Sequence, residues 1–168
     1  MADLFISYSQ KDRDRVERLV DALTAEGYEV WWDLKIRAGE SFDELIEGTL
    51  EKVSCVVGVW SHSAVKSEWV RAESAWAKDQ GIFVSVCIDD GARLPLKFYH
   101  VHTASLADWD GARDDLRFRR LVADIRMIAG PPRSPAQATG EVLPAALPEV
   151  PPVQEPSPAP TEKPASQA

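Results

Sequence analysis

The sequence predicts a flavodoxin-like α/β fold with three layers, in which helices cover both faces of a central five-stranded parallel sheet. Stretches of strand type alternate with stretches of helical periodicity, and this alternation is typical of parallel sheets. Residues 53–60 are almost wholly apolar, as expected of a central strand that is buried on both faces. A chain of 168 residues with 45% hydrophobic content is long enough for one domain with a substantial core.

The predicted elements follow one another in a regular order. Strands are expected at residues 4–8, 28–32, 53–60 and 82–88, with a weaker strand near 99–103. The polar segment 9–12 offers a cap for a first helix, which Gly27 ends and whose apolar stripe is Val16, Leu19, Val20 and Leu23. Ser41 is expected to cap a second helix, and residues 66–76 belong to a third. The final helix carries a stripe formed by Phe118, Leu121, Val122, Ile125 and Ile128.

The composition of the chain changes after Gly130. Eleven of the twelve prolines follow this residue, and no aromatic residue does. A segment rich in proline and alanine and poor in large apolar side chains cannot bury enough surface to fold. We therefore expect a domain at residues 1–130 and a disordered tail or linker at residues 131–168.

Composition also argues against several classes of protein. A net charge of −8 and an isoelectric point near 4.9 disfavour nucleic-acid binding, which needs a concentrated basic face. No apolar run reaches the roughly 18 to 20 residues that span a bilayer, and the N-terminus lacks the basic region of a signal peptide. We therefore expect a cytoplasmic protein that does not bind membranes. Cys55 and Cys87 lie inside predicted strands and are expected to fill the core, without a disulfide or a metal.

The predicted topology indicates where a ligand would bind. In parallel sheets of this kind, ligands bind at the carboxyl ends of the strands, where the strand order reverses, so the loops 7–9, 32–34 and 60–62 should meet there. The first turn has no glycine, which excludes a dinucleotide-binding Rossmann turn and a P-loop. A phosphoacceptor receiver would need an acidic pair after the first strand and an aspartate at the end of the third, where this chain has Ser-Tyr-Ser and Trp-Ser-His. His62 is a solitary loop histidine, and His100 and His102 have no acidic or cysteine ligand placed beside them to complete a metal site.

Glu73 stands where the pattern of its helix calls for an apolar residue. Trp69, Ala72, Glu73 and Trp76 fall at i, i+3, i+4 and i+7, so they are expected to share one stripe. A buried carboxylate is unfavourable by several kcal/mol unless it is paired, hydrogen-bonded or open to a cleft. Two interpretations therefore stand: a glutamate at the edge of the stripe that reaches water or an arginine, or a carboxylate that faces a functional cleft. The helix begins at the predicted ligand edge, which favours the cleft.

Three stretches together resemble one family. Residues 5–9 (Phe-Ile-Ser-Tyr-Ser) resemble the first box of Toll/interleukin-1 receptor (TIR) domains, and residues 33–42 resemble the second box, the BB loop. Residues 67–73 resemble the Ser-x-Trp-x-x-x-Glu segment of the enzymatic members. The chain is similar to TIR domains of bacterial type over about residues 1–130. It departs from animal and plant members in having Trp69-Val70 where they carry Trp-Cys.

The resemblance implies an NAD⁺ hydrolase that cleaves the bond between nicotinamide and ribose. The products would be nicotinamide and ADP-ribose, or a cyclic isomer of ADP-ribose, in bacterial immune signalling such as antiviral defence, or as an effector. NAD⁺ would be the substrate, with no cofactor or metal. Glu73 takes the catalytic role by this resemblance, and the substrate-binding residues would be Phe5, Ser7, Trp32, Asp33, Arg37 and Trp69. Arg37 would either face the pyrophosphate or form a salt bridge with Glu40.

A second interpretation belongs to a different class. Many TIR domains only bind other TIR domains, as adaptors or as mimics of host adaptors, and Glu73 would then be idle. The retention of Trp69 and Glu73 at the enzymatic spacing favours the enzyme. In either case the resemblance implies self-association into homo-oligomers through the loop 33–41.

Overall fold

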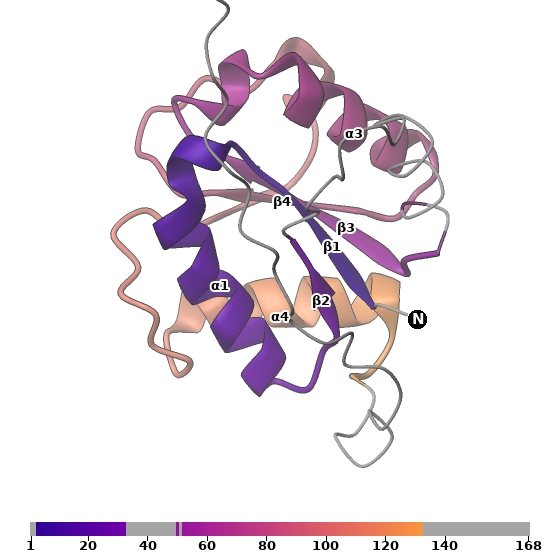
Figure 1. Ribbon diagram of the computed structural model, residues 1–168, viewed down its shortest axis with the longest axis vertical. Coiled ribbons are helices and arrows are strands. Elements are labelled where there is room, and N and C mark those ends of the chain that lie inside the picture. Colours follow the sequence, from indigo (N-terminus) through magenta and orange to yellow (C-terminus); the bar gives the residue numbers. More distant parts are fainter. Residues whose placement is uncertain (1–2, 33–49, 51, 133–168) are drawn as a thin grey trace, which may run out of the picture.

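The computed structural model describes residues 3–32, 50 and 52–132. Five parallel strands form one sheet in the order β2-β1-β3-β4-β5 (Figure 1). Their bounds are Leu4–Ser7 for β1, Val30–Trp31 for β2, Cys55–Trp60 for β3, Phe83–Cys87 for β4 and Thr103–Ser105 for β5. The predicted α/β fold with a five-stranded parallel sheet is confirmed.

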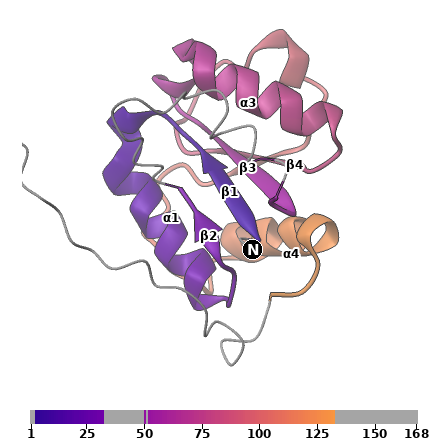
Figure 2. The same ribbon diagram turned by 45° about the vertical axis from the view of Figure 1, so that its right-hand side comes forward.

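Helices lie on both faces of this sheet (Figure 2). Helices α1 (Arg13–Ala25) and α4 (Leu116–Ala129) cover one face, and α3 (Glu68–Asp79) covers the other. Alternate residues of a strand point to opposite faces, so Leu4 and Ile6 of β1 join the core under α1 and α4, while Phe5 joins the core under α3. Strand β3 lies between β1 and β4 and is buried along its whole length, as its apolar sequence predicts.

The ends of the helices use local capping. Gly27, with φ at 96°, follows the end of α1, a conformation that glycine adopts without strain. The Oγ atom of Ser67 accepts a hydrogen bond from the backbone N–H of Val70 at 3.3 Å and so begins α3. Asp12 of the segment 9–12 is the N-cap residue of α1, as predicted. Residues Gln10–Asp12 form a short 3₁₀ turn, η1, and the Asp12 side chain makes no capping bond; its carboxylate accepts from the Ser61 hydroxyl instead.

The fifth strand lies later in the sequence than the pattern suggests. Leu96–Phe98 form a 3₁₀ turn, η3, after Pro95, and the Phe98 side chain packs against Trp60 with a centroid distance of 4.8 Å. Because this turn uses the apolar residues just before position 99, pairing with β4 begins only at Thr103. The predicted second helix and the loop 33–41 lie outside the described residues, apart from helical Leu50.

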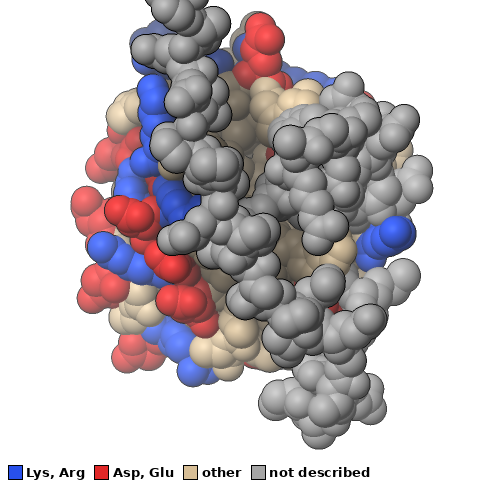
Figure 3. All heavy atoms as spheres, in the orientation of Figure 1, with Lys and Arg blue, Asp and Glu red and all other residues tan. Residues whose placement is uncertain are grey.

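Charges of both signs are mixed over the α1 side of the molecule, shown at the left of Figure 3. Arg15 pairs with Asp89 at 2.7 Å, and Arg113 pairs with Glu26 at the same distance. On α4, Arg117 pairs with its neighbour Asp115 at 2.8 Å. In the part of the chain that the structure describes, no helix has the length and apolar character needed to cross a membrane.

Candidate functional site

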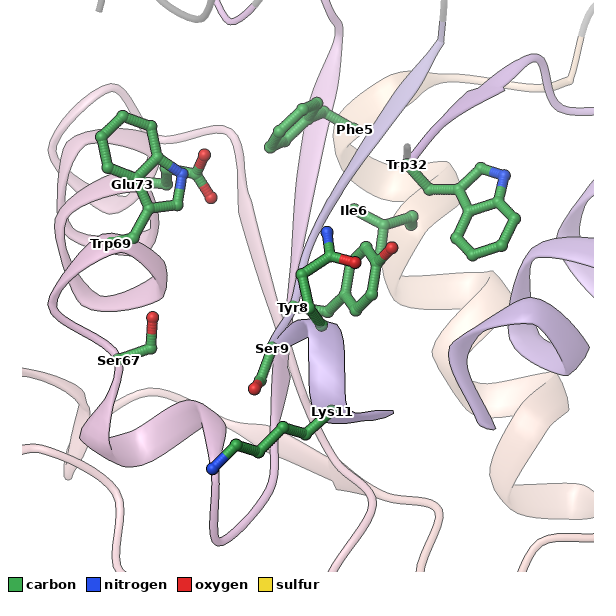
Figure 4. A pocket seen from close by; sticks show the side chains of 10 residues that line it. Phe5, Ile6, Tyr8, Ser9, Lys11, Trp32, Ser67, Trp69 and Glu73 are labelled. Carbon is green, nitrogen blue, oxygen red and sulfur yellow. The ribbon is translucent and has the colours of Figure 1, made fainter. Parts of the chain in front are cut away.

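A cavity of about 460 Å³ opens at the carboxyl ends of β1 and β2, beside α3 (Figure 4). The chain runs from β1 outward to β2 on one side and later to β3 on the other, so this is the point where the strand order reverses and where ligands bind in such sheets. The described residues that line the cavity are Phe5, Ile6, Tyr8, Ser9, Gln10, Lys11, Trp32, Ser67, Trp69 and Glu73.

Glu73 lies on the buried face of α3, and only 6% of the residue is exposed. The buried positions of this helix are Val70, Glu73, Ser74 and Ala77, spaced at i, i+3, i+4 and i+7. The predicted stripe was therefore wrong by about one position, since Ala72 is exposed while Trp69 and Trp76 are half-buried and flank the buried face. The cleft interpretation of Glu73 holds, because its carboxylate is both buried and part of the cavity wall.

Small residues let α3 approach the sheet closely enough to bring Glu73 to β1. Gly58 of β3 lies beside Ser7 in the parallel register. A Cβ atom at Gly58 would stand 2.6 Å from Cε2 of Phe83 and 2.8 Å from Oγ of Ser74. Both distances are shorter than any van der Waals contact, so only glycine fits here without moving Phe83 or α3.

Two side-chain donors hold the Glu73 carboxylate. The Ser7 hydroxyl donates to Oε2 of Glu73 at 2.5 Å, and the Trp69 indole donates a second hydrogen bond. Figure 4 shows Trp69 and Glu73 side by side on α3. Burial raises the pKa of Glu73 from its ordinary value of 4.5 to about 7, and the bonds from Ser7 and Trp69 partly oppose this rise. The carboxylate is thus ionised above neutral pH and poised to change charge near it.

The opposite wall of the cavity is aromatic and carries a positive charge at its rim. Tyr8 and Trp32 pack against each other with ring centroids 5.9 Å apart, and the guanidinium of Arg13 lies 5.1 Å from the Trp32 ring. Lys11 is exposed and lines the same cavity. Aromatic faces stack on planar rings, and a lysine pairs with an anion. The cavity therefore offers contacts to a ligand that has both a planar ring and an anionic group.

The structure brings most of the predicted site residues together. Phe5, Trp32, Trp69 and Glu73 line the cavity, whereas Ser7 is not among the residues of its wall and donates a hydrogen bond to Glu73. Asp33 and Arg37 lie outside the described residues.

The prediction that the loop 60–62 joins the site is wrong for the described cavity. The Ser61 hydroxyl donates to Oδ2 of Asp12 at 2.5 Å, and the backbone N–H of His62 donates to Asp89 at 2.8 Å. These bonds tie the loop after β3 to Asp12 of η1 and to Asp89, which follows β4. The described residues that line the cavity do not include this loop.

Ser9 lines the cavity, as expected of the loop 7–9. Sequence reasoning missed three other polar residues of the wall, namely Gln10, Lys11 and Ser67. Gln10 and Lys11 belong to the segment that the sequence assigns to helix capping, although a turn at this edge of the sheet also faces any ligand. Ser67 was part of the recognised segment 67–73, and its helix-capping position places it at the cavity entrance. The polarity of Gln10 and Lys11 and their position in the turn after β1 could have indicated that they face a ligand.

The cysteines are poor candidates for chemistry. Cys55 is fully buried, and burial raises the pKa of its thiol to about 12. Burial also raises the pKa of the Cys87 thiol, which donates to the backbone carbonyl of Asp89. Among residues 3–32, 50 and 52–132, no group of three or more His, Cys, Asp or Glu side chains is arranged to hold a metal ion.

Comparison with solved structures agrees with this fold. The TIR domain of the Toll-related receptor TRR-2 from Hydra magnipapillata superposes with a TM-score of 0.64 at 21% identity, covering 75% of this chain and 99% of that one. A TIR-STING receptor from C. gigas, in complex with 2′,3′-cGAMP, gives a TM-score of 0.58 at 20% identity, covering 79% of this chain and 40% of that one. At these identities the likeness concerns the fold alone.

Comparison of sequences identifies the family. The 2′ cyclic ADP-D-ribose synthase BtTIR of Bacteroides thetaiotaomicron is 34% identical over 73 residues, which are 42% of this chain and 25% of that relative. This chain therefore matches only a quarter of the relative's length. The family model of the TIR domain matches residues 4–122, which is more than half of the chain. The chain therefore belongs to the TIR domain family.

Proposed function

We propose that this TIR domain cleaves NAD⁺ at the bond between nicotinamide and ribose, with Glu73 as the catalytic residue. The observation that carries the proposal is the Glu73 carboxylate, which is almost wholly buried, is held by two donors and lines a cavity with aromatic walls. A scaffold has no need of such a carboxylate, because an apolar residue at this position would stabilise the fold better.

The chemistry suits a single carboxylate. The bond between the ribose carbon and the pyridinium nitrogen breaks with its electron pair on nitrogen, so nicotinamide leaves as a neutral molecule and needs no general acid. The ribose then carries oxocarbenium-like positive charge, as in glycoside cleavage. An anion close to this charge stabilises it, most effectively where water is excluded. Water adds to the cationic carbon and loses a proton, which Glu73 is placed to accept; attack by a group of the same molecule would give a cyclic isomer instead.

Other residues of the wall would bind the remainder of NAD⁺. Phe5, Trp32 and Trp69 offer faces for the planar rings. The relative BtTIR, which is named as a synthase of 2′ cyclic ADP-ribose, supports NAD⁺ as the substrate class. We propose a role in bacterial immune signalling, such as antiviral defence, on the same resemblance. Asp33 and Arg37 remain predicted substrate contacts.

The pyrophosphate of NAD⁺ gives Lys11 a testable role. Lys11 is the one positively charged side chain among the described residues that line the cavity. Reversing its charge with Lys11→Glu is expected to raise KM for NAD⁺ by about tenfold, with little change in kcat, because the lost contact is remote from the breaking bond. Steady-state kinetics measure both constants. Lys52→Glu is the matched control, since Lys52 is also exposed but precedes β3, at the opposite end of the sheet. Equal KM values for the two variants would exclude this role.

The proposal as a whole is tested by incubating the purified chain with NAD⁺ at low and high protein concentration, and separating the products by chromatography. Nicotinamide together with ADP-ribose or a cyclic isomer is the expected result. We also propose self-association through the loop 33–41, so activity per molecule should rise with protein concentration; constant specific activity would contradict that part. Absence of turnover at every concentration would reject the enzyme and favour the domain that only binds other TIR domains.

A further inference from the structure

Ser7 occupies an unusual place beside the site. It is the last residue of β1, only 1% of it is exposed, and it is not part of the cavity wall. Its hydroxyl nevertheless donates to Oε2 of Glu73 at 2.5 Å, across a separation of 66 residues in the sequence. The side chain therefore reaches the Glu73 carboxylate from the sheet.

The surrounding fold fixes this contact. Ser7 follows Phe5 by two residues in β1, so both side chains point toward α3. Gly58 lies beside Ser7 in the register and lets α3 approach, while the Ser67 cap sets where α3 begins. The contact between the Ser7 hydroxyl and Glu73 thus joins a strand of the sheet directly to one helix.

The two groups that donate to Glu73, the Trp69 indole and the Ser7 hydroxyl, differ in whether they also accept a hydrogen bond. An indole N–H only donates, whereas a serine hydroxyl donates to a carboxylate and accepts from a carboxylic acid. Ser7 is therefore able to keep its contact when Glu73 changes protonation state, and a donated bond favours the ionised state. No positively charged side chain is paired with Glu73 among the described residues. The hydrogen bonds from Ser7 and Trp69 therefore stabilise the ionised carboxylate.

We propose that Ser7 is a positioning residue for Glu73: it holds Oε2 against the end of β1, so that the carboxylate stays ionised and keeps one orientation toward the cavity. This inference rests on the proposed function for its kinetic part only. It differs from the predicted role of Ser7 as a substrate-binding residue, because the bond made by the hydroxyl goes to Glu73.

The test begins with a titration that needs no substrate. The side-chain carboxyl signal of Glu73 is followed by ¹³C NMR against pH and is assigned by its loss in Glu73→Gln. Ser7→Ala should raise the pKa of Glu73 by about one unit, because a donor to the ionised form is lost. Ser7→Cys replaces the hydroxyl with a somewhat larger thiol, which is a weaker donor, and should shift the pKa in the same direction; it serves if the alanine variant does not fold. Ser7→Thr restores a hydroxyl and should return the pKa toward the wild-type value.

Ser61→Ala is the matched control, since Ser61 is equally buried and also donates to a carboxylate at 2.5 Å, that of Asp12. It should leave the Glu73 titration unchanged.

In the kinetic part, Ser7→Ala should lower kcat by about tenfold with a small change in KM. The acid limb of the pH profile should move to higher pH by the same amount as the pKa measured by NMR. A Glu73 titration that is the same in wild type, Ser7→Ala and Ser7→Cys would overturn the inference even if NAD⁺ is cleaved. Failure of wild type to cleave NAD⁺ would reject the proposed function and leave the titration valid.

Discussion

Glu73→Gln is expected to lower kcat for NAD⁺ cleavage by about 10³-fold or more, because the neutral amide cannot balance the positive charge that develops on the ribose. The amide has nearly the same shape: its oxygen accepts a hydrogen bond, and its NH₂ group is able to donate to the Ser7 hydroxyl oxygen, so the cavity should be preserved. Measurement of nicotinamide release by both proteins at pH 8 gives the ratio. Glu68→Gln is the control, because Glu68 is exposed in the first turn of the same helix and should retain full turnover.

The same variant should be more stable than the wild type at alkaline pH. The pKa of Glu73 is raised from 4.5 to about 7 in the folded domain, so the folded state holds this proton more tightly than the unfolded state does. The free energy of unfolding of the wild type therefore falls as the pH rises from 4.5 to about 7. Above the folded pKa the whole decrease, about 3 kcal/mol, is present. Glutamine never ionises, so the melting temperature of Glu73→Gln should exceed that of wild type by several degrees at pH 8 and match it near pH 4.5. A lower melting temperature at pH 8 would show that Glu73 is a structural residue.

Gly58→Val is expected to destabilise the domain by about 1–3 kcal/mol and to reduce turnover by about 100-fold, although Gly58 is not part of the cavity wall. The added side chain meets Phe83 and Ser74 at less than 3 Å, with closest approaches of 2.6 and 2.8 Å from its Cβ. Relief of this overlap requires α3 or Phe83 to move away from the sheet. A shift of α3 would lengthen the bond between Ser7 and Glu73 and displace the carboxylate.

The control for Gly58→Val is Val57→Leu, one residue earlier in β3. Val57 points to the opposite face of the sheet, into the core under α1 and α4. Overpacking there should cost a similar free energy of unfolding, measured by urea denaturation, but leave α3 in place and turnover close to wild type below the melting temperature. Equal losses of turnover in both variants would mean that general destabilisation, rather than the position of α3, controls activity.

The order of the elements could be predicted because most of them have a strong local signal. The apolar run of β3 is decided by the sequence itself and agrees with the structure. The predicted stripe of α4 is buried at Phe118, Leu121, Val122 and Ile125, but Ile128, in the last turn, is exposed. The fifth strand was placed too early because the 3₁₀ turn at Leu96–Phe98 depends on a tertiary contact, the packing of Phe98 on Trp60. Such a contact leaves no periodic pattern in the sequence.

The site was only partly predictable for the same reason. Periodicity put Glu73 on the inner side of α3, but the large indoles of Trp69 and Trp76 suggested the wrong stripe, since size usually indicates burial. The helix instead presents Ser74 and Ala77 to the sheet, because it approaches over Gly58. The contact between Ser7 and Glu73 joins residues far apart in the sequence and could be found only once the register of β1 and β3 was known.

The dependence of kcat/KM on pH for the wild type tests most directly the claim that ionised Glu73 carries out the cleavage. This ratio reports ionisation of the free enzyme. Glu73 is the one carboxylate among the described residues that line the cavity. We expect kcat/KM to be constant at alkaline pH and to fall by about tenfold per pH unit below the Glu73 pKa of about 7. Activity that stays constant down to about pH 5, or that falls only near the pKa of an ordinary glutamate, would contradict the account.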